Sequence, residues 1–213
     1  NNREISNLTM SADGSRIAVG TPKAGINDGT YGYSRVYEWG GTAWSPLGLP
    51  FFCNGSPPQE WIGADVALSG DGMTIAVGTR FSGMTAQGEQ GGFVDVFVWN
   101  ADASPDPAWV SLDDGRLRGT ELSGSDSFGY QVAMSGDGSV LIAGAYHNDD
   151  EHTNAGHIRA FKRYDYMSPP GGPTGRVRVY DYVAASLNDW EPRPELVGQN
   201  AGYNVGARRS VAM

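Results

Sequence analysis

The densest group of potential metal ligands in the sequence is one short acidic segment. Its residues are Asn148, Asp149, Asp150 and Glu151. Ca²⁺ is a hard cation that binds several carboxylate and amide oxygens at once, so this segment is a weak candidate for a calcium site. The corresponding segments 27–29 and 87–89 carry little of this charge, and a solvated acidic loop is the default interpretation.

Three histidines crowd the same region, at positions 147, 152 and 157. Together with the acidic residues they could form a transition-metal cluster. Their spacing of five residues matches none of the usual zinc patterns. Surface histidines are therefore the favoured interpretation of His147, His152 and His157.

A carboxylate also recurs in a phrase that occurs three times along the chain. Each copy places a short apolar run before Ser-x-Asp-Gly and a β-branched apolar run after it. The turn residues are Asp13, Gly14, Asp71, Gly72, Asp137 and Gly138. This pattern predicts a β-hairpin, since glycine accepts the positive φ that a tight turn requires. With one carboxylate per turn, each aspartate is expected to bond the backbone amides that follow it rather than calcium.

The sequence shows no recognisable catalytic motif. A nucleophile elbow, a phosphate-binding loop and a dinucleotide fingerprint are all missing. Asp113 and Asp114 are adjacent and would point to opposite faces of a strand, which disfavours a paired acid–base role. We therefore expect no enzymatic activity and no cofactor, with calcium at 148–151 as the candidate ion.

The composition predicts a folded, β-rich chain. The 213 residues include 31 Gly and 12 Pro, which indicates many turns, and no apolar run approaches the ~20 residues needed to cross a bilayer. The net charge of −9 with scattered basic residues argues against nucleic acid as a partner. The single Cys53 cannot form a disulfide within the chain. Sequons at Asn7 and Asn54 permit N-glycosylation of a secreted chain.

Four strands recur within each copy of the repeat. Two flank the Asp-Gly turn, an aromatic third strand follows at 35–39, 94–99 and 158–164, and a fourth follows at 44–48, 109–112 and 190–198. The prolines of the fourth strand suit a sheet edge. Tandem four-stranded units of about 60 residues indicate an all-β chain forming blades of a β-propeller.

The predicted division of the single propeller follows from these strands. The blades span 1–52, 60–118 and 122–165, with an incomplete blade at 174–198 and the start of another at 201–213. An aromatic strand at 176–182 follows its counterpart after only 19 residues, so we expect that about 40 residues are missing near Tyr164 to Pro173. A blade that lost its inner half is the alternative.

Five tryptophans recur at equivalent places of the blades: Trp39, Trp44, Trp99, Trp109 and Trp190. Packing between blades is their expected role, and a platform for stacking carbohydrate is the alternative. Trp61 is aligned with Phe128 and is expected in the core.

The segment from Phe128-Gly129 through Asp137-Gly138 to Gly144, followed by Gly156 to Phe161, resembles the FG-GAP repeats of integrin-α-like propellers. It is most similar to a variant with Leu-Ser-x-Asp-Gly found in large surface proteins of microbes and algae. The resemblance covers the whole chain. It implies about four blades here, as part of a ring of about seven, and an extracellular or cell-surface location.

Together these features predict a non-enzymatic extracellular structural or adhesive repeat module, part of a larger surface or filament protein. Its expected partners are proteins or glycans at the cell surface, copies of itself included, with no membrane insertion. The expected contact surface is formed by the loops 22–33, 80–91 and 146–156. A secreted propeller enzyme acting on polysaccharide and a calcium-dependent, integrin-like ligand binder are the alternatives.

Overall fold

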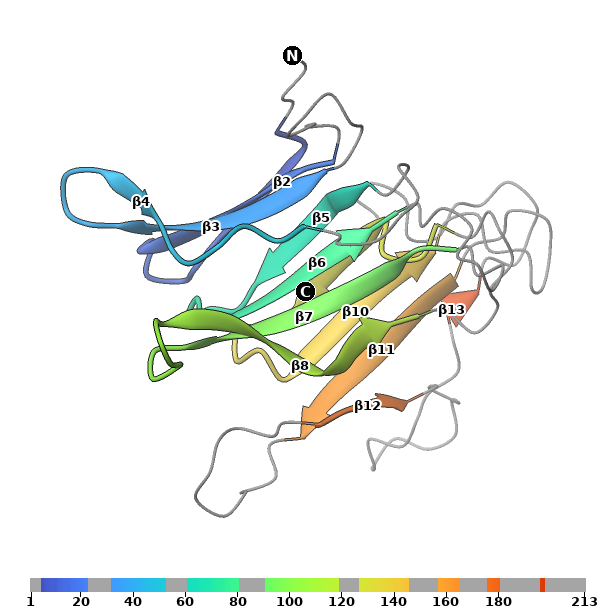
Figure 1. Ribbon diagram of the computed structural model, residues 1–213. Coiled ribbons are helices and arrows are strands. Elements are labelled where there is room, and N and C mark those ends of the chain that lie inside the picture. Colours follow the sequence, from blue (N-terminus) through green and yellow to red (C-terminus); the bar gives the residue numbers. More distant parts are fainter. Residues whose placement is uncertain are drawn as a thin grey trace.

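The computed structural model of the chain is built from β-strands alone in the part that it describes (Figure 1). The structure describes residues 5–22, 32–52, 61–80, 91–118, 127–145, 157–164, 176–180 and 196–197. Within these ranges there is no helix, and so none that could span a membrane. The strands form three sheets, and the expectation of an all-β fold is confirmed.

The first two sheets are antiparallel meanders of four strands in chain order. The first contains β1 (Asn7–Met10), β2 (Arg16–Thr21), β3 (Tyr33–Trp39) and β4 (Trp44–Pro46). The second contains β5 (Ile62–Leu68), β6 (Thr74–Thr79), β7 (Phe93–Asn100) and β8 (Ala108–Leu117). Pro46 lies on the edge strand of its sheet, where a missing backbone donor is tolerated.

The third sheet has β9 (Gln131–Met134), β10 (Val140–Ala145), β11 (His157–Tyr164) and β12 (Arg176–Tyr180) in order, and β13 (Leu196–Val197) also pairs with β11. The sequence analysis assigned 176–180 to a separate, incomplete blade. In the structure this segment pairs antiparallel with β11, with Phe161 opposite Val179. The short connection 165–175 explains the difference, because it joins antiparallel neighbours without needing another blade.

The register of the three sheets is the same. Residues opposite one another across the first three strands form rows, such as Met10–Ile17–Tyr37, Leu68–Ile75–Phe97 and Met134–Leu141–Phe161. We call the face that carries these rows face A. The opposite face, face B, carries the rows Thr9–Ala18–Val36, Ala67–Ala76–Val96 and Ala133–Ile142–Ala160.

The sheets stack face to face, so the second sheet lies between the other two (Figure 1). One apolar core joins face B of the first sheet to face A of the second, and another joins face B of the second to face A of the third. Strands β5 and β6 are therefore buried on both sides, which explains their nearly continuous apolar sequence. This is a β-propeller-like arrangement of blades, and the described residues do not close a ring.

Candidate functional site

The three Ser-x-Asp-Gly segments lie in the hairpin turns β1–β2, β5–β6 and β9–β10. In the first turn the Gly14 amide donates to the Ser11 carbonyl at 3.0 Å. Gly14 has a φ of 73°, and Asp13 does not have a positive φ. Aspartate and glycine therefore occupy the last two positions of a type I turn, not the two central positions of a type I′ turn.

The serine of each turn connects its two ends. The Ser11 hydroxyl donates to Asp13 Oδ1 at 2.6 Å and accepts from the Arg16 amide at 2.9 Å. Ser69 and Ser135 make the same two bonds in their own turns. Sequence reasoning missed this role, although a serine two residues before each aspartate in all three copies is the signal that could have revealed it.

The aspartates are occupied by the turns themselves. Oδ1 of Asp13 accepts from the Ser11 hydroxyl, the Ser15 amide and the Ser15 hydroxyl. These bonds, the serine bond above all, lower the pKa of Asp13 to about 2, and the equivalent bonds lower the pKa of Asp137 to about 2. Hydrogen bonds to the carboxylate stabilise its charged form, so these aspartates are anionic turn-formers at neutral pH.

The turns of neighbouring sheets are joined through their backbones. The Ala12 amide donates to the Gly70 carbonyl at 2.8 Å, and the Gly70 amide donates to the Gly136 carbonyl at 2.7 Å. The three residues occupy the same turn position. The result is a directional chain of hydrogen bonds in which each turn donates to the next one along the sequence.

Glycines allow close approach at the other end of the strands. A Cβ on Gly20 would lie 2.4 Å from the Gly63 carbonyl oxygen, and a Cβ on Gly78 would lie 2.1 Å from that of Gly129. Gly63 and Gly129 have φ of 77° and 78°, which disfavours other residues. The backbone is thus kinked at Ile62-Gly63 and at Phe128-Gly129. Each kink packs against a glycine of the preceding sheet.

Arginines also cross from one sheet to the next. Arg16 pairs with Glu38 of its own sheet at 2.8 Å and donates to the Gly72 carbonyl of the second sheet at 3.1 Å. Arg163 of the third sheet donates to the Thr74 hydroxyl of the second at 3.3 Å. Both arginines lie near the hairpin-turn end and reinforce the stacking there.

Two equivalent tryptophan pairs have different environments. Trp99 and Trp109 lie with ring centroids 5.4 Å apart, and the Trp109 indole N–H donates to the Leu47 carbonyl of the first sheet at 2.9 Å. Trp39 and Trp44 have the same separation of 5.4 Å. Trp39 and Trp44 are 43% and 40% exposed. Of these two pairs, only Trp99 and Trp109 have the expected role between sheets.

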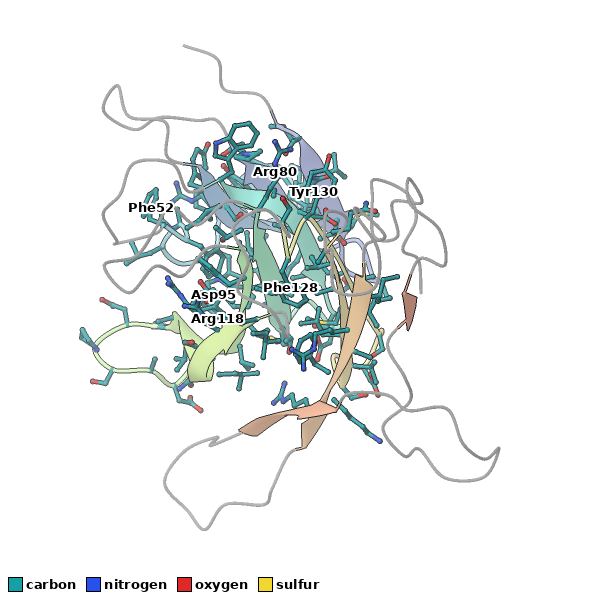
Figure 2. The ribbon with its side chains drawn as sticks, turned by 90° about the vertical axis from the view of Figure 1, so that its right-hand side faces the viewer. Phe52, Arg80, Asp95, Arg118, Phe128 and Tyr130 are labelled. Carbon is teal, nitrogen blue, oxygen red and sulfur yellow. The ribbon has the colours of Figure 1, made fainter. Side chains whose placement is uncertain are left out.

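Trp61 is not the counterpart of Phe128. The glycine contacts align Ile62 with Phe128, and both of these side chains are buried in the cores between sheets. Trp61 is half-buried and lies under the guanidinium of Arg80, whose carbon is 4.2 Å from its ring centroid. Tyr130 lies on the same guanidinium at 5.2 Å, as Figure 2 shows for Arg80 and Tyr130.

Asn7, a predicted glycosylation site, is used for contact between sheets. Its side-chain amide donates to the Ala64 carbonyl of the second sheet and, at 3.4 Å, to the Ser6 hydroxyl. In the second sheet the equivalent Asp65 accepts from the Val132 amide of the third at 2.9 Å. The polar residue at this inner-strand position therefore connects the first sheet to the second and the second sheet to the third.

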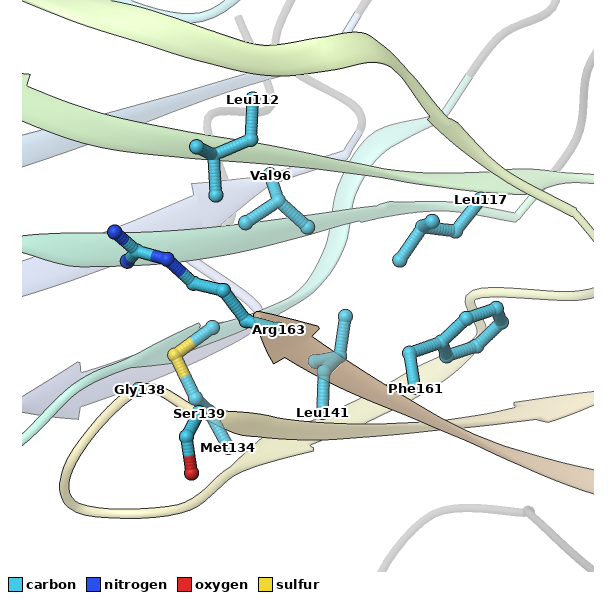
Figure 3. A pocket seen from close by; sticks show the side chains of 9 residues that line it. All are labelled: Val96, Leu112, Leu117, Met134, Gly138, Ser139, Leu141, Phe161 and Arg163. Atoms are coloured by element: carbon cyan, nitrogen blue, oxygen red, sulfur yellow. The ribbon is translucent and has the colours of Figure 1, made fainter. Parts of the chain in front are cut away.

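A small hollow lies between the second and third sheets (Figure 3). It is lined by Val96, Leu112, Leu117, Met134, Gly138, Ser139, Leu141, Phe161 and Arg163. It has room for about one water molecule, whereas ligand pockets typically measure about 300–1,000 Å³. The hollow is a packing gap between sheets.

Several predicted site residues lie outside the described residues. They are Asn148, Asp149, Asp150, Glu151, His147, His152, Cys53, Asn54 and Trp190. His157 begins β11, and the proposed contact loops also fall almost wholly outside the described ranges. The described part contains no group of three or more His, Cys, Asp or Glu residues that could hold a metal ion. The calcium and Asn54 glycosylation assignments stay predictions.

The three stacked antiparallel sheets define the class of this chain as a tandem β-repeat with a propeller-like arrangement. The sequence model of the FG-GAP repeat matches residues 113–161, so the chain contains an FG-GAP repeat, as the sequence analysis expected. This match includes Phe128-Gly129 and the third hairpin turn.

A solved structure shares the fold over most of the chain. It is a hypothetical selenium-binding protein from Sulfolobus tokodaii, with a TM-score of 0.52 and 8% identity over 92% of this chain. The chain spans 42% of the length of that protein. No curated protein matches the sequence.

Proposed function

We propose that the chain is part of an extracellular, non-enzymatic β-propeller that makes protein–protein or protein–glycan contacts within a larger surface or filament protein. FG-GAP repeats form propeller modules that bind proteins, and residues 113–161 match such a repeat. In this proposal the module needs no cofactor, and its rigid stacked sheets present the contact surface.

The exposed pair Trp39 and Trp44 is the observation that carries the proposal. The equivalent half-buried pair, Trp99 and Trp109, shows what this arrangement can bind. The Trp109 indole N–H donates to the Leu47 carbonyl, and a Cβ on Gly48 would lie within 2.9 Å of both tryptophans. A tryptophan pair on this hairpin therefore accepts a bent backbone segment in which Gly48 has a φ of 72°. The exposed pair offers the same aromatic surface to a partner peptide or to the apolar face of a sugar.

Binding of the purified chain to a glycan array and to immobilised glycine-containing peptides tests the proposal. We expect Trp39→Ala and Trp44→Ala to abolish binding, while Leu49→Ala, at a residue that is 83% exposed, leaves it intact. Binding is expected to persist in EDTA, and the chain is expected to hydrolyse no polysaccharide. Binding that is lost in EDTA or is insensitive to both tryptophan variants would contradict it.

A further inference from the structure

The guanidinium of Arg80 is stacked between two aromatic rings where the second and third sheets meet. Its carbon lies 4.2 Å from the ring centroid of Trp61 and 5.2 Å from that of Tyr130. Arg80 directly follows β6 of the second sheet, and Tyr130 directly precedes β9 of the third (Figure 2). All three residues are half-buried, so the stack rests on both sheets and also reaches the molecular surface.

Stacking of the sheets does not depend on these residues. Between the first and second sheets the equivalent positions hold Pro22 and Ala64, which are buried. The close glycine contacts are nevertheless the same at both places. An arginine and an aromatic ring at these positions are therefore an addition to the fold, and their presence needs another explanation.

A second arginine shows what a stacked guanidinium binds in this chain. Arg116 lies over the ring of Phe93, with 4.0 Å between its guanidinium carbon and the ring centroid. Its Nε is also 3.4 Å from Asp95 Oδ1. The ring contacts the face of the guanidinium and the carboxylate contacts its edge. The two contacts do not compete, because all five N–H donors lie in the guanidinium plane.

Aromatic rings on both faces prepare Arg80 for the same edge-on contact. They fix the plane of its guanidinium, so less side-chain freedom is lost when a ligand binds. The five donors of Arg80 can serve a ligand's carboxylate as well as acceptors within the chain. Tryptophan, tyrosine and arginine are also the residues that contribute most often to the binding energy of protein–protein interfaces.

We propose that the Trp61–Arg80–Tyr130 stack is a contact site for a carboxylate side chain of a partner protein. The carboxylate accepts two parallel N–H···O bonds from the edge of the Arg80 guanidinium. This site is separate from the Trp39–Trp44 pair. It rests on the proposed function in one respect, since it supplies the chemistry by which the module would recognise a protein.

NMR titration of the isotope-labelled chain with poly-L-glutamate at neutral pH tests the site without any substitution. We expect the Nε–H signal of Arg80 to shift and saturate, while that of Arg116, which is paired with Asp95, stays in place. Polygalacturonate, an acidic polysaccharide, is the second probe. An Arg80 signal that does not move with poly-L-glutamate would overturn the proposal. A stronger response to polygalacturonate would overturn it in favour of an acidic glycan.

Arg80→Gln and Arg116→Gln are matched variants, because each removes one positive charge from an arginine stacked on an aromatic ring. We expect Arg80→Gln to weaken poly-L-glutamate binding by about tenfold or more, since hydrogen bonds between charged groups are lost. Arg116→Gln should bind like the native chain. Arg80→Lys keeps the charge without the planar edge and should bind as weakly as Arg80→Gln. Equal weakening by the two glutamine variants would show an effect of net charge alone and overturn the proposal.

The tryptophan variants separate this site from the proposed function. Binding of poly-L-glutamate at Arg80 is expected to survive Trp39→Ala and Trp44→Ala, which abolish the binding expected of the exposed pair. Arg80→Gln should in turn leave the binding of the exposed pair intact. Each proposal can therefore fail while the other holds.

Discussion

The substitution Gly78→Ala tests whether close approach of the backbones holds the sheets together. The added Cβ would lie 2.1 Å from the Gly129 carbonyl oxygen and 3.1 Å from its carbonyl carbon. Both atoms belong to the backbone of the next sheet, so no side chain can rotate away. The second and third sheets must separate locally, and the core between them must loosen.

The magnitude follows from two opposing effects. Overpacking a well-packed core typically costs about 1–3 kcal/mol, whereas a glycine-to-alanine change returns about 0.4–1 kcal/mol by restricting the unfolded chain. We expect a net loss of about 1 kcal/mol in the free energy of unfolding. For a chain of this size that corresponds to a fall of roughly 2–4 °C in melting temperature.

Urea and thermal unfolding, followed by circular dichroism and tryptophan fluorescence, measure the effect. Gly136→Ala is the matched control, because a Cβ there meets nothing within 4 Å and Ala12 already occupies the same turn position in the first sheet. The control should be as stable as the native chain or slightly more stable. If Gly78→Ala unfolds at the same urea concentration and temperature as Gly136→Ala, the close approach does not contribute to stacking.

Three further predictions concern the turns and the contacts between sheets. The pKa of about 2 for Asp13 and Asp137, below the ordinary 3.8, means that their carboxylates stabilise the fold above about pH 4 and that this contribution is lost as the pH falls towards 2. Asp13→Asn with Asp137→Asn should flatten the melting temperature between pH 4 and pH 2; an unchanged slope would contradict this. Trp109→Phe should lower the free energy of unfolding by about 1 kcal/mol through its lost hydrogen bond, while Trp44→Phe should not, and equal losses would speak against this bond. Mass spectrometry of the chain secreted from a eukaryotic host should find Asn7 unmodified, because both amide hydrogens are donated; a glycan there would show that these bonds do not form.

The hairpins and their repetition were predictable because they depend on neighbouring residues. Ser-x-Asp-Gly contains the whole turn, and the flanking apolar residues alternate as half-buried strands do. The position of residues 176–180 was not predictable in this way. Third and outer strands both alternate, so their sequences look alike, and pairing with β11 depends on tertiary contacts.

The contacts between sheets also could not be predicted from residues that are neighbours in the sequence. Trp61 and Ile62 are both suitable apolar counterparts of Phe128 by residue type. The distinction comes from Gly63, whose carbonyl faces Gly20 of another sheet. Likewise, the sequence placed tryptophans at equivalent positions but could not show that Trp39 lies exposed, because exposure depends on which sheets are neighbours.

The repeated residues and the recognition residues of such a chain must differ. The residues that recur in register form the turns and pack the sheets together. Examples are the turn serines and the glycines that approach the backbone of a neighbouring sheet. One partner can therefore be distinguished from another only through positions whose residues differ between the first junction, where the first and second sheets meet, and the second junction, where the second and third sheets meet. Arg80 and Tyr130 at the second junction occupy the places of Pro22 and Ala64 at the first, and they add a cation–π contact there. We expect binding specificity in this fold to depend on such variable residues. The repeated Ser-x-Asp-Gly hairpins determine their positions in the structure.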